Sequence, residues 1–217
     1  MALPTQSPVP RPLFIVFEGP DGSGKTSLST RVGSELRKAG RGATVAALPG
    51  RTPGSLGDLV YRIHHDPTSA GLHGLTPSAL QALHIGAQLD AIETRLLPGL
   101  RSGESLILDR YWWSTWVYGR RQGVDAVLLD SLVATQASLW GGVTPDVIFL
   151  LHRSRSIHAN VPVEEYRGIA AGYAQLAERE SARQRVQHVD NEGAFEATLA
   201  AVLDTITTLH TTDHPES

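Results

Sequence analysis

The chain of 217 residues contains no cysteine. Without cysteine, the sequence offers no disulfide framework, no thiolate nucleophile and no cysteine-ligated zinc site. Stability must therefore come from an ordinary core, and a chain of this length with 41% apolar residues is large enough to form one. A reducing compartment suits this composition, and we expect a cytoplasmic protein.

The sequence also lacks a basic surplus and a long apolar run. Lys and Arg number 19 against 22 Asp and Glu, which gives a net charge of −3. Proteins that coat nucleic acids or lie on membrane surfaces need a basic stripe, so we expect neither partner. No stretch approaches the roughly 18 apolar residues that a membrane span requires.

Both ends of the chain differ in composition from the part between them. Residues 1–12 are rich in proline and carry no early Lys or Arg, and we expect a disordered tail instead of a signal peptide. Residues 211–217 are polar, and we expect them to fray. No linker or repeat divides residues 13–210, so we expect a single domain there.

Short apolar runs alternate with helical patterns throughout this domain. The runs predict strands at residues 13–17, 43–48, 105–109, 146–151 and 185–190. The helical patterns cover residues 26–39, 56–63, 76–97, 112–120, 125–139, 163–179 and 194–209, and we expect the third to end before Pro98. Such alternation predicts an α/β fold, a parallel sheet of about five strands with helices on both faces.

A glycine-rich loop follows the first predicted strand. The segment GPDGSGKT matches the motif G-x-x-x-x-G-K-[ST] in full, between a strand and a helix, and indicates a P-loop NTPase-type sheet. Glycines let backbone N–H groups surround phosphate oxygens, Lys25 supplies a positive charge and the Thr26 hydroxyl is suited to Mg²⁺. The candidate nucleotide-binding residues are Gly19, Asp21, Gly22, Ser23, Gly24, Lys25, Thr26 and Ser27.

Residues suited to a second, phosphorylated ligand lie further along the chain. Asp109 and Arg110 directly follow a buried strand, at the sheet edge where parallel α/β folds bind ligands. Asp109 suits the Mg²⁺ shell, and Arg110 suits a bidentate phosphate contact. Arg51, in a Gly/Pro loop, is a second candidate phosphate ligand. Asp21 would repel a triphosphate, so we expect it to face a different ligand.

At these segments the chain resembles the thymidylate kinase family. FEGPDGSGKTS is similar to the family's EGxDGxGKST, RTPGSLGD resembles a shortened REPGGTxxGE, and DRYWWSTWVYG resembles DRYxxSxxAYQ. The resemblance extends over residues 13–205. It implies phosphoryl transfer from ATP and Mg²⁺ to a nucleoside monophosphate, dTMP or a related, possibly modified pyrimidine deoxynucleotide, and it suggests a homodimer with contacts on the long helix and the Trp-rich helix.

The resemblance also assigns roles on the acceptor side. It implies that Asp21 meets the 3′-hydroxyl of the acceptor sugar and that Arg51 and Arg110 hold the acceptor phosphate. Tyr118 would pack on the sugar or base. Tyr111 and Ser114 belong to the same motif and are further candidate substrate-binding residues.

The sequence departs from the family where the base is read. The family has a Phe and an Arg four residues apart on the long helix, and this chain has His84 and Gln88 there. The spacing still puts both side chains on one helix face. Either they contact an altered base or they are solvated helix residues and the base lies elsewhere. The family's Gln after the tyrosine of AYQ is Gly119 here.

The lid near residues 153–167 is about fifteen residues shorter than in the family by our alignment. Family members carry a catalytic arginine in either the P-loop or the lid, and the P-loop position is Gly22. The lid should therefore supply that arginine, with Arg153, Arg155 and Arg167 as candidates, although a solvated turn would contain the same residues. Loss of such an arginine slows transfer by orders of magnitude.

Two alternatives to a monophosphate kinase remain open from the sequence. A deoxynucleoside kinase is disfavoured because an uncharged acceptor offers no phosphate to Arg51 and Arg110. A nucleotide-binding protein with weak catalysis and a regulatory role is suggested by the short lid and the altered base contacts.

Overall fold

The computed structural model of the protein describes residues 11–211, so most of both expected tails lies outside the described residues. Its elements are β1 (Phe14–Glu18), α1 (Lys25–Lys38), β2 (Ala43–Ala47), α2 (Leu56–His65), η1 (Pro67–Ala70), α3 (Pro77–Ala91), η2 (Ile92–Leu96), α4 (Leu97–Arg101), β3 (Ser105–Asp109), α5 (Trp112–Arg121), α6 (Ala126–Trp140), β4 (Val147–His152), α7 (Val163–Glu180), β5 (Val186–Asp190) and α8 (Phe195–Thr211).

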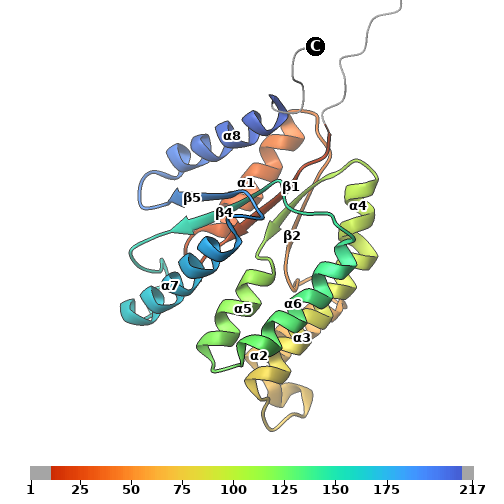
Figure 1. Cartoon of the computed structure of the whole chain (residues 1–217), viewed down its shortest axis with the longest axis vertical. Helices are drawn as coiled ribbons and strands as arrows, with labels where there is room; N and C mark the ends of the chain where they lie inside the picture. Colours follow the sequence, from red (N-terminus) through yellow and green to blue (C-terminus); the bar gives the residue numbers. More distant parts are fainter. Residues whose placement is uncertain (1–10, 212–217) are drawn as a thin grey trace, which may run out of the picture.

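The five strands form one parallel sheet in the order β2-β3-β1-β4-β5. Figure 1 shows the helices on both of its faces. This confirms the predicted fold class. Central β1 and β3 are buried along their whole length, as expected of strands covered on both sides.

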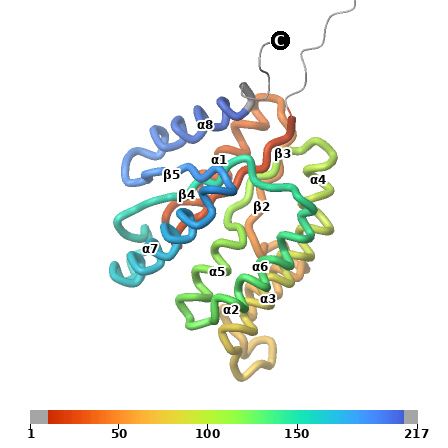
Figure 2. Tube along the Cα trace, in the orientation of Figure 1, coloured from red at the N-terminus to blue at the C-terminus, as the bar shows by residue number. Residues whose placement is uncertain are grey.

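Two apolar clusters cover the two faces of the sheet. Alternate strand residues such as Ile15, Phe17 and Phe149 pack with α1 and α8. The intervening ones pack with α5, α6 and α7, where Trp112 and Trp113 are 5% and 0% exposed. These tryptophans are therefore core residues, and Figure 2 shows α3, α5 and α6 running together beside this core.

The long helix differs from its predicted end. It continues beyond Pro98 to Arg101, through a π-helical turn at η2 in which the Leu97 N–H donates to Ile92 O. A proline ring normally crowds the carbonyl four residues earlier and ends a helix. The wider π turn directly before Pro98 changes the hydrogen-bond spacing there, which lets the helix continue.

The part of the chain that the structure describes contains no helix long and apolar enough to cross a membrane. Within residues 11–211 no group of three or more His, Cys, Asp or Glu side chains is arranged to hold a metal ion.

Candidate active site

The loop from β1 to α1 begins the site. Gly19 adopts φ 140°, a conformation that side chains rarely allow, and a Cβ there would lie 2.8 Å from Leu151 O. The loop then enters α1 at Gly24, whose φ is 101°. The sequence thus folds locally into a tight backbone cradle at a helix N-terminus, which favours an anion.

Lys25 lies inside this cradle and is 4% exposed. Its Nζ donates to Gly19 O and Pro20 O, both at 2.8 Å. Burial lowers the pKa of the ammonium, and the charges of Asp109 and Glu18 act in the opposite direction. Because both acceptors are neutral carbonyls, the ammonium can exchange them for phosphate oxygens.

A hydroxyl and a carboxylate meet at the entrance to α1. Thr26 Oγ1 donates to Asp109 Oδ2 at 2.5 Å. The other carboxylate oxygen, Oδ1, is buried and has no hydrogen-bond partner in the described part of the chain. A hydroxyl beside an unsatisfied carboxylate oxygen is a donor set that suits Mg²⁺, so the predicted metal residues fit that ion.

Arg110 follows β3 and adopts a left-handed backbone, with φ 77°. One guanidinium nitrogen donates to Ser114 Oγ at 3.1 Å, and another is paired with the Asp21 carboxylate. Tyr118 completes this group, since its hydroxyl donates to Asp21 Oδ2 at 3.0 Å and accepts from the Asp21 N–H at 3.1 Å. Four predicted site residues are thus brought together.

Glu18 lies beneath this group and was not anticipated from the sequence. Its carboxylate is fully buried and accepts from the Tyr111 N–H at 2.6 Å and from Ser114 N and Oγ at 3.2 and 2.8 Å. Burial raises its pKa to about 6, against the lowering effect of its hydrogen bonds and of Arg110. An acidic residue ending a buried strand was the available signal.

Two other predicted substrate residues are positioned differently from expectation. The ring of Tyr111 packs against Phe14 and Trp140 in the core, with the residue 4% exposed, so its side chain does not face a ligand. Arg51 is exposed and stacks over Tyr61 at 4.1 Å. Within the described residues it makes none of the hydrogen bonds that join Arg110, Asp21 and Tyr118.

The expected base-reading pair is split between two environments. Gln88 is 2% exposed; its amide donates to Thr115 Oγ1 at 3.0 Å and accepts from Gln136 at 2.9 Å. Gln88 is therefore not a solvated helix residue, and its amide is bonded to neighbouring helices. His84 is half-buried and its Nε2 lies 3.1 Å from His64 Nδ1. Burial lowers the His84 pKa to about 4.

Gly119 stands where the resemblance expects glutamine, and packing explains the glycine. A Cβ at this position would lie 2.8 Å from Leu129 Cδ2 and 3.1 Å from Gln81 Cγ. The close approach of α5 to α3 and α6 therefore leaves no room for a side chain here.

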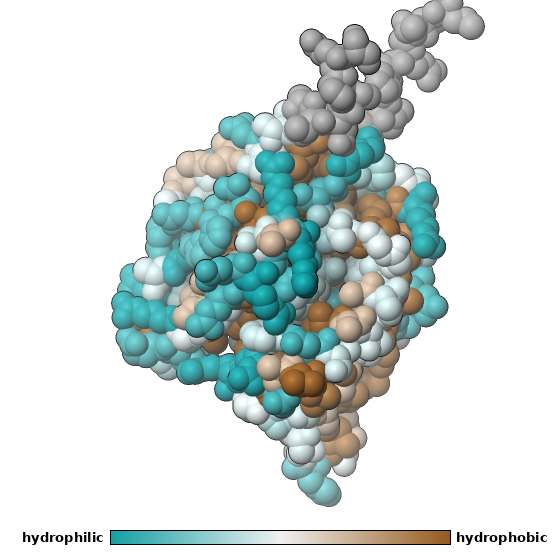
Figure 3. Space-filling view, in the orientation of Figure 1, coloured by the Kyte–Doolittle hydropathy of each residue, from teal (hydrophilic) through white to brown (hydrophobic). Residues whose placement is uncertain are grey.

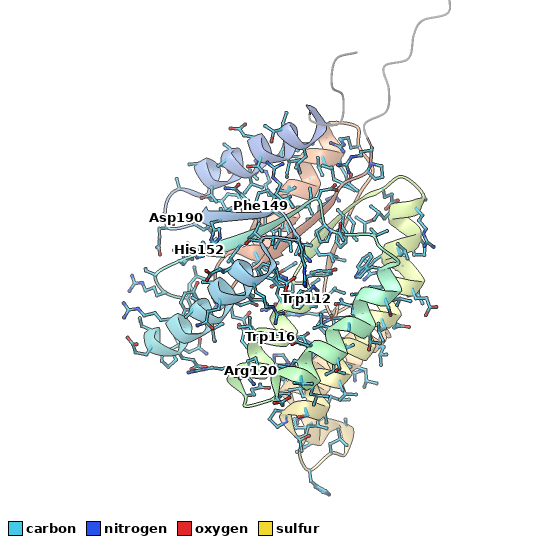
Figure 4. The ribbon with its side chains drawn as sticks, in the orientation of Figure 1. Trp112, Trp116, Arg120, Phe149, His152 and Asp190 are labelled. Atoms are coloured by element: carbon cyan, nitrogen blue, oxygen red, sulfur yellow. The ribbon has the colours of Figure 1, made fainter. Side chains whose placement is uncertain are left out.

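The short lid is the segment of residues 153–162, before α7. The Arg153 guanidinium donates to Asn191 O and lies 3.7 Å from Glu192. Arg155 is exposed, and Arg167, already on α7, is paired with Glu164 at 2.9 Å. Figure 4 shows where the lid begins, at His152 beside Asp190 of β5.

Comparison with known proteins supports the resemblance. A family model described as "Thymidylate kinase" matches residues 17–192. A thymidylate kinase of Pelotomaculum thermopropionicum is 32% identical over 189 residues, which are 80% of this chain and 83% of the relative. A thymidylate kinase of Solidesulfovibrio magneticus is 32% identical over 192 residues, 87% and 86% of the two chains.

A solved structure of thymidylate kinase from Ehrlichia chaffeensis has a similar fold, with a TM-score of 0.72 at 23% identity over 91% of this chain and 100% of that one. The fold, the phosphate loop and the matched sequence agree, and this chain belongs to the thymidylate kinase family of phosphotransferases.

Proposed function

We propose that this protein transfers the γ-phosphoryl group of ATP to dTMP. The observation that carries the proposal is the meeting of the Lys25 cradle with the Arg110–Asp21–Tyr118 group at the carboxyl edge of β1 and β3. A triphosphate-binding loop next to a cation suited to a second phosphate is the arrangement that aligned transfer between two nucleotides requires. The names of the relatives support dTMP as the acceptor.

On the acceptor side, Arg110 would bind the dTMP phosphate and Asp21 the 3′-hydroxyl of its sugar. Tyr118 would pack on the sugar, and Arg51 would reach the phosphate from the loop after β2. Ser114 would act on the substrate through Arg110, which it holds at 3.1 Å. Because Gln88 is bonded within the protein, the half-buried His84 is the better candidate for a contact with the base.

Phosphoryl transfer has a loose transition state whose charge spreads over the phosphoryl oxygens, so positive charge and alignment supply most of the catalysis. Lys25 would neutralise charge on the donor phosphates. Of the lid candidates, Arg155 is exposed and able to approach the transferred group, whereas Arg153 is bonded to Asn191 and paired with Glu192. We therefore favour Arg155 for this role over Arg153.

Thr26 and Asp109 would hold Mg²⁺, which neutralises charge on the β- and γ-phosphates of the donor. The unsatisfied Asp109 Oδ1 supports this assignment.

We also propose a homodimer and a cytoplasmic location. The Trp112 and Trp113 rings of α5 are buried within the chain, which leaves α3 and its neighbour α6 as the candidate contact surface. Figure 3 shows apolar residues on the side of the molecule that carries these helices.

The proposal is tested by measuring ADP release with dTMP, dUMP, dCMP, dAMP, dGMP and thymidine as acceptors. We expect dTMP to give the highest kcat/KM and thymidine to give no turnover, because only a monophosphate engages Arg110. Substitution R110A should lower kcat/KM for dTMP about a hundredfold or more. Equal turnover of thymidine, or no turnover with every monophosphate, would contradict the proposal.

A further inference from the structure

The backbone carbonyls of the phosphate loop are hydrogen-bonded one after another. Each of the consecutive carbonyls from residue 19 to residue 23 accepts a hydrogen bond. Lys25 serves the first two. The Asp21 carbonyl accepts from Ser156 Oγ at 3.0 Å, the Gly22 carbonyl from the Ile157 N–H at 3.1 Å, and the Ser23 carbonyl from Asn191 Nδ2 at 2.8 Å.

Two of these donors come from the short lid, far from the loop in the sequence. Ser156 is 9% exposed, and its hydroxyl also accepts from the His158 N–H at 3.1 Å, so both its donor and its acceptor capacity are in use. The lid approaches so closely that a Cβ on Gly22 would overlap Ser156 Oγ and lie 3.0 Å from Ile157 N. Glycine at position 22 therefore lets the lid dock on the loop.

The direction of each loop carbonyl matters for anion binding because it fixes the direction of the N–H group that follows it. In a trans peptide the C=O and the following N–H point in opposite directions. A donor that holds the Asp21 carbonyl outward therefore turns the Gly22 N–H inward, and the bond from Asn191 to the Ser23 carbonyl does the same for the Gly24 N–H. Inward N–H groups are what a phosphate loop presents to its ligand.

We propose that Ser156 and the Ile157 N–H are positioning groups for nucleotide binding, a role that rests on the proposed binding of ATP to this loop. The short lid is then an outer brace of the phosphate cradle, and Asn191 is its counterpart from the end of β5. Arg153 strengthens the brace through its bond to Asn191 O. Ser156 and the Ile157 N–H act on the donor nucleotide through the loop carbonyls without touching it.

The test measures ATP affinity by calorimetry on the full-length protein, in the presence of Mg²⁺. S156A removes the hydroxyl, and we expect ATP to bind about three- to tenfold more weakly, the effect of one hydrogen bond. The matched control is S102A, which removes a hydroxyl bonded to Gly99 O at 2.8 Å at the end of α4 and should leave the affinity unchanged.

A second pair of variants tests the backbone donor. I157P removes the N–H that reaches the Gly22 carbonyl, whereas I157A keeps it. We expect I157P to bind ATP at least threefold more weakly than I157A. Residue 157 is 59% exposed, so both variants should fold, and thermal unfolding of each verifies this.

Steady-state kinetics distinguish positioning from general loss of structure. In S156A the KM for ATP should rise with the affinity loss, while the KM for dTMP stays within about twofold, because Tyr118 and Arg110 hold the Asp21 carboxylate independently. The proposal is contradicted if S156A and I157P both bind ATP as tightly as the wild type. If S156A does not fold, equal ATP affinities of I157P and I157A are enough to contradict the proposal. A wild-type protein that does not bind ATP would instead contradict the proposed function.

Discussion

Glu18 is a carboxylate whose protonation the fold shifts toward neutral pH. It is fully buried, and burial raises its pKa to about 6 from 4.5. An acid with a raised pKa in the folded state stabilises the fold below its unfolded pKa, and this contribution is lost as the pH rises through the folded pKa. Between pH 4.5 and about 6, ionisation of this buried carboxyl group therefore lowers the free energy of unfolding.

Substitution E18Q should remove this pH dependence. The shift from 4.5 to about 6 corresponds to about 2 kcal/mol. Relative to E18Q, the wild type should thus lose about 2 kcal/mol of unfolding free energy between pH 4.5 and pH 7.5, measured by urea unfolding at both values. The exposed carboxylate Glu93 on η2 provides the control, E93Q, which should follow the wild type. Parallel pH curves for E18Q and the wild type would disprove the assignment.

At the residue scale, Lys25, Thr26, Asp109 and Arg110 lie where their motifs predict, whereas Arg51 and Tyr111, predicted from motifs as well, lie elsewhere. Lys25, Thr26, Asp109 and Arg110 follow strands that are adjacent in the sheet, so their proximity could be inferred from the alternation of strands and helices. The contact of Ser156 with Asp21 could not be inferred, because it joins two loops 135 residues apart. Hydrophobic periodicity carries no information about such loop contacts.

At the scale of elements, Gln88 joins three helices. Its amide on α3 bonds Thr115 on α5 and Gln136 on α6, and both glutamines are at most 2% exposed. Each of these hydrogen bonds offsets part of the cost of burying its two polar groups, so the loss of one is unfavourable.

Substitution Q88A should therefore destabilise the protein. It leaves Thr115 and Gln136 each without a partner that they have in the wild type, at a cost of about 1–3 kcal/mol for each unsatisfied group. Urea unfolding should give a loss within about 2–5 kcal/mol once some relaxation is allowed. Q187A, on the exposed side of β5, should change stability by less than about 0.5 kcal/mol. A loss below about 0.5 kcal/mol for Q88A would contradict the proposed contribution of these hydrogen bonds to stability.

The long helix shows where local rules were insufficient. Its N-terminus at Pro77 with Thr76 as cap follows from local chemistry, and the Thr76 hydroxyl indeed accepts from Ala79 N at 3.2 Å. Its C-terminus does not, because the π turn before Pro98 overrides the usual effect of proline. Likewise, sequence spacing put His84 and Gln88 on one helix face, but which face is buried depends on α5 and α6.

At the scale of the whole molecule, the surface of α6 has an exposed apolar side. Val127 and Leu128 are 73% and 41% exposed near the start of this helix. Burial of exposed apolar side chains favours association, and α6 lies beside α3, the other proposed contact.

Sedimentation analysis tests the proposed dimer. The wild type should sediment at twice the mass of one chain, and V127E should shift the equilibrium toward the monomer by at least tenfold, because the dimer would bury the introduced charge. The control is V163E, at a 41% exposed position on α7. A monomeric wild type, or a dimer that V127E leaves intact, would argue against this surface.

The central claim is that the two halves of the site work on two phosphorylated ligands. The most direct measurement is ³¹P NMR of the protein with ATP, Mg²⁺ and dTMP, in which the products are identified by their own signals. We predict that dTDP and ADP appear at equal rates in the wild type and not in K25A. Release of inorganic phosphate without dTDP, or no reaction with dTMP, would contradict this account.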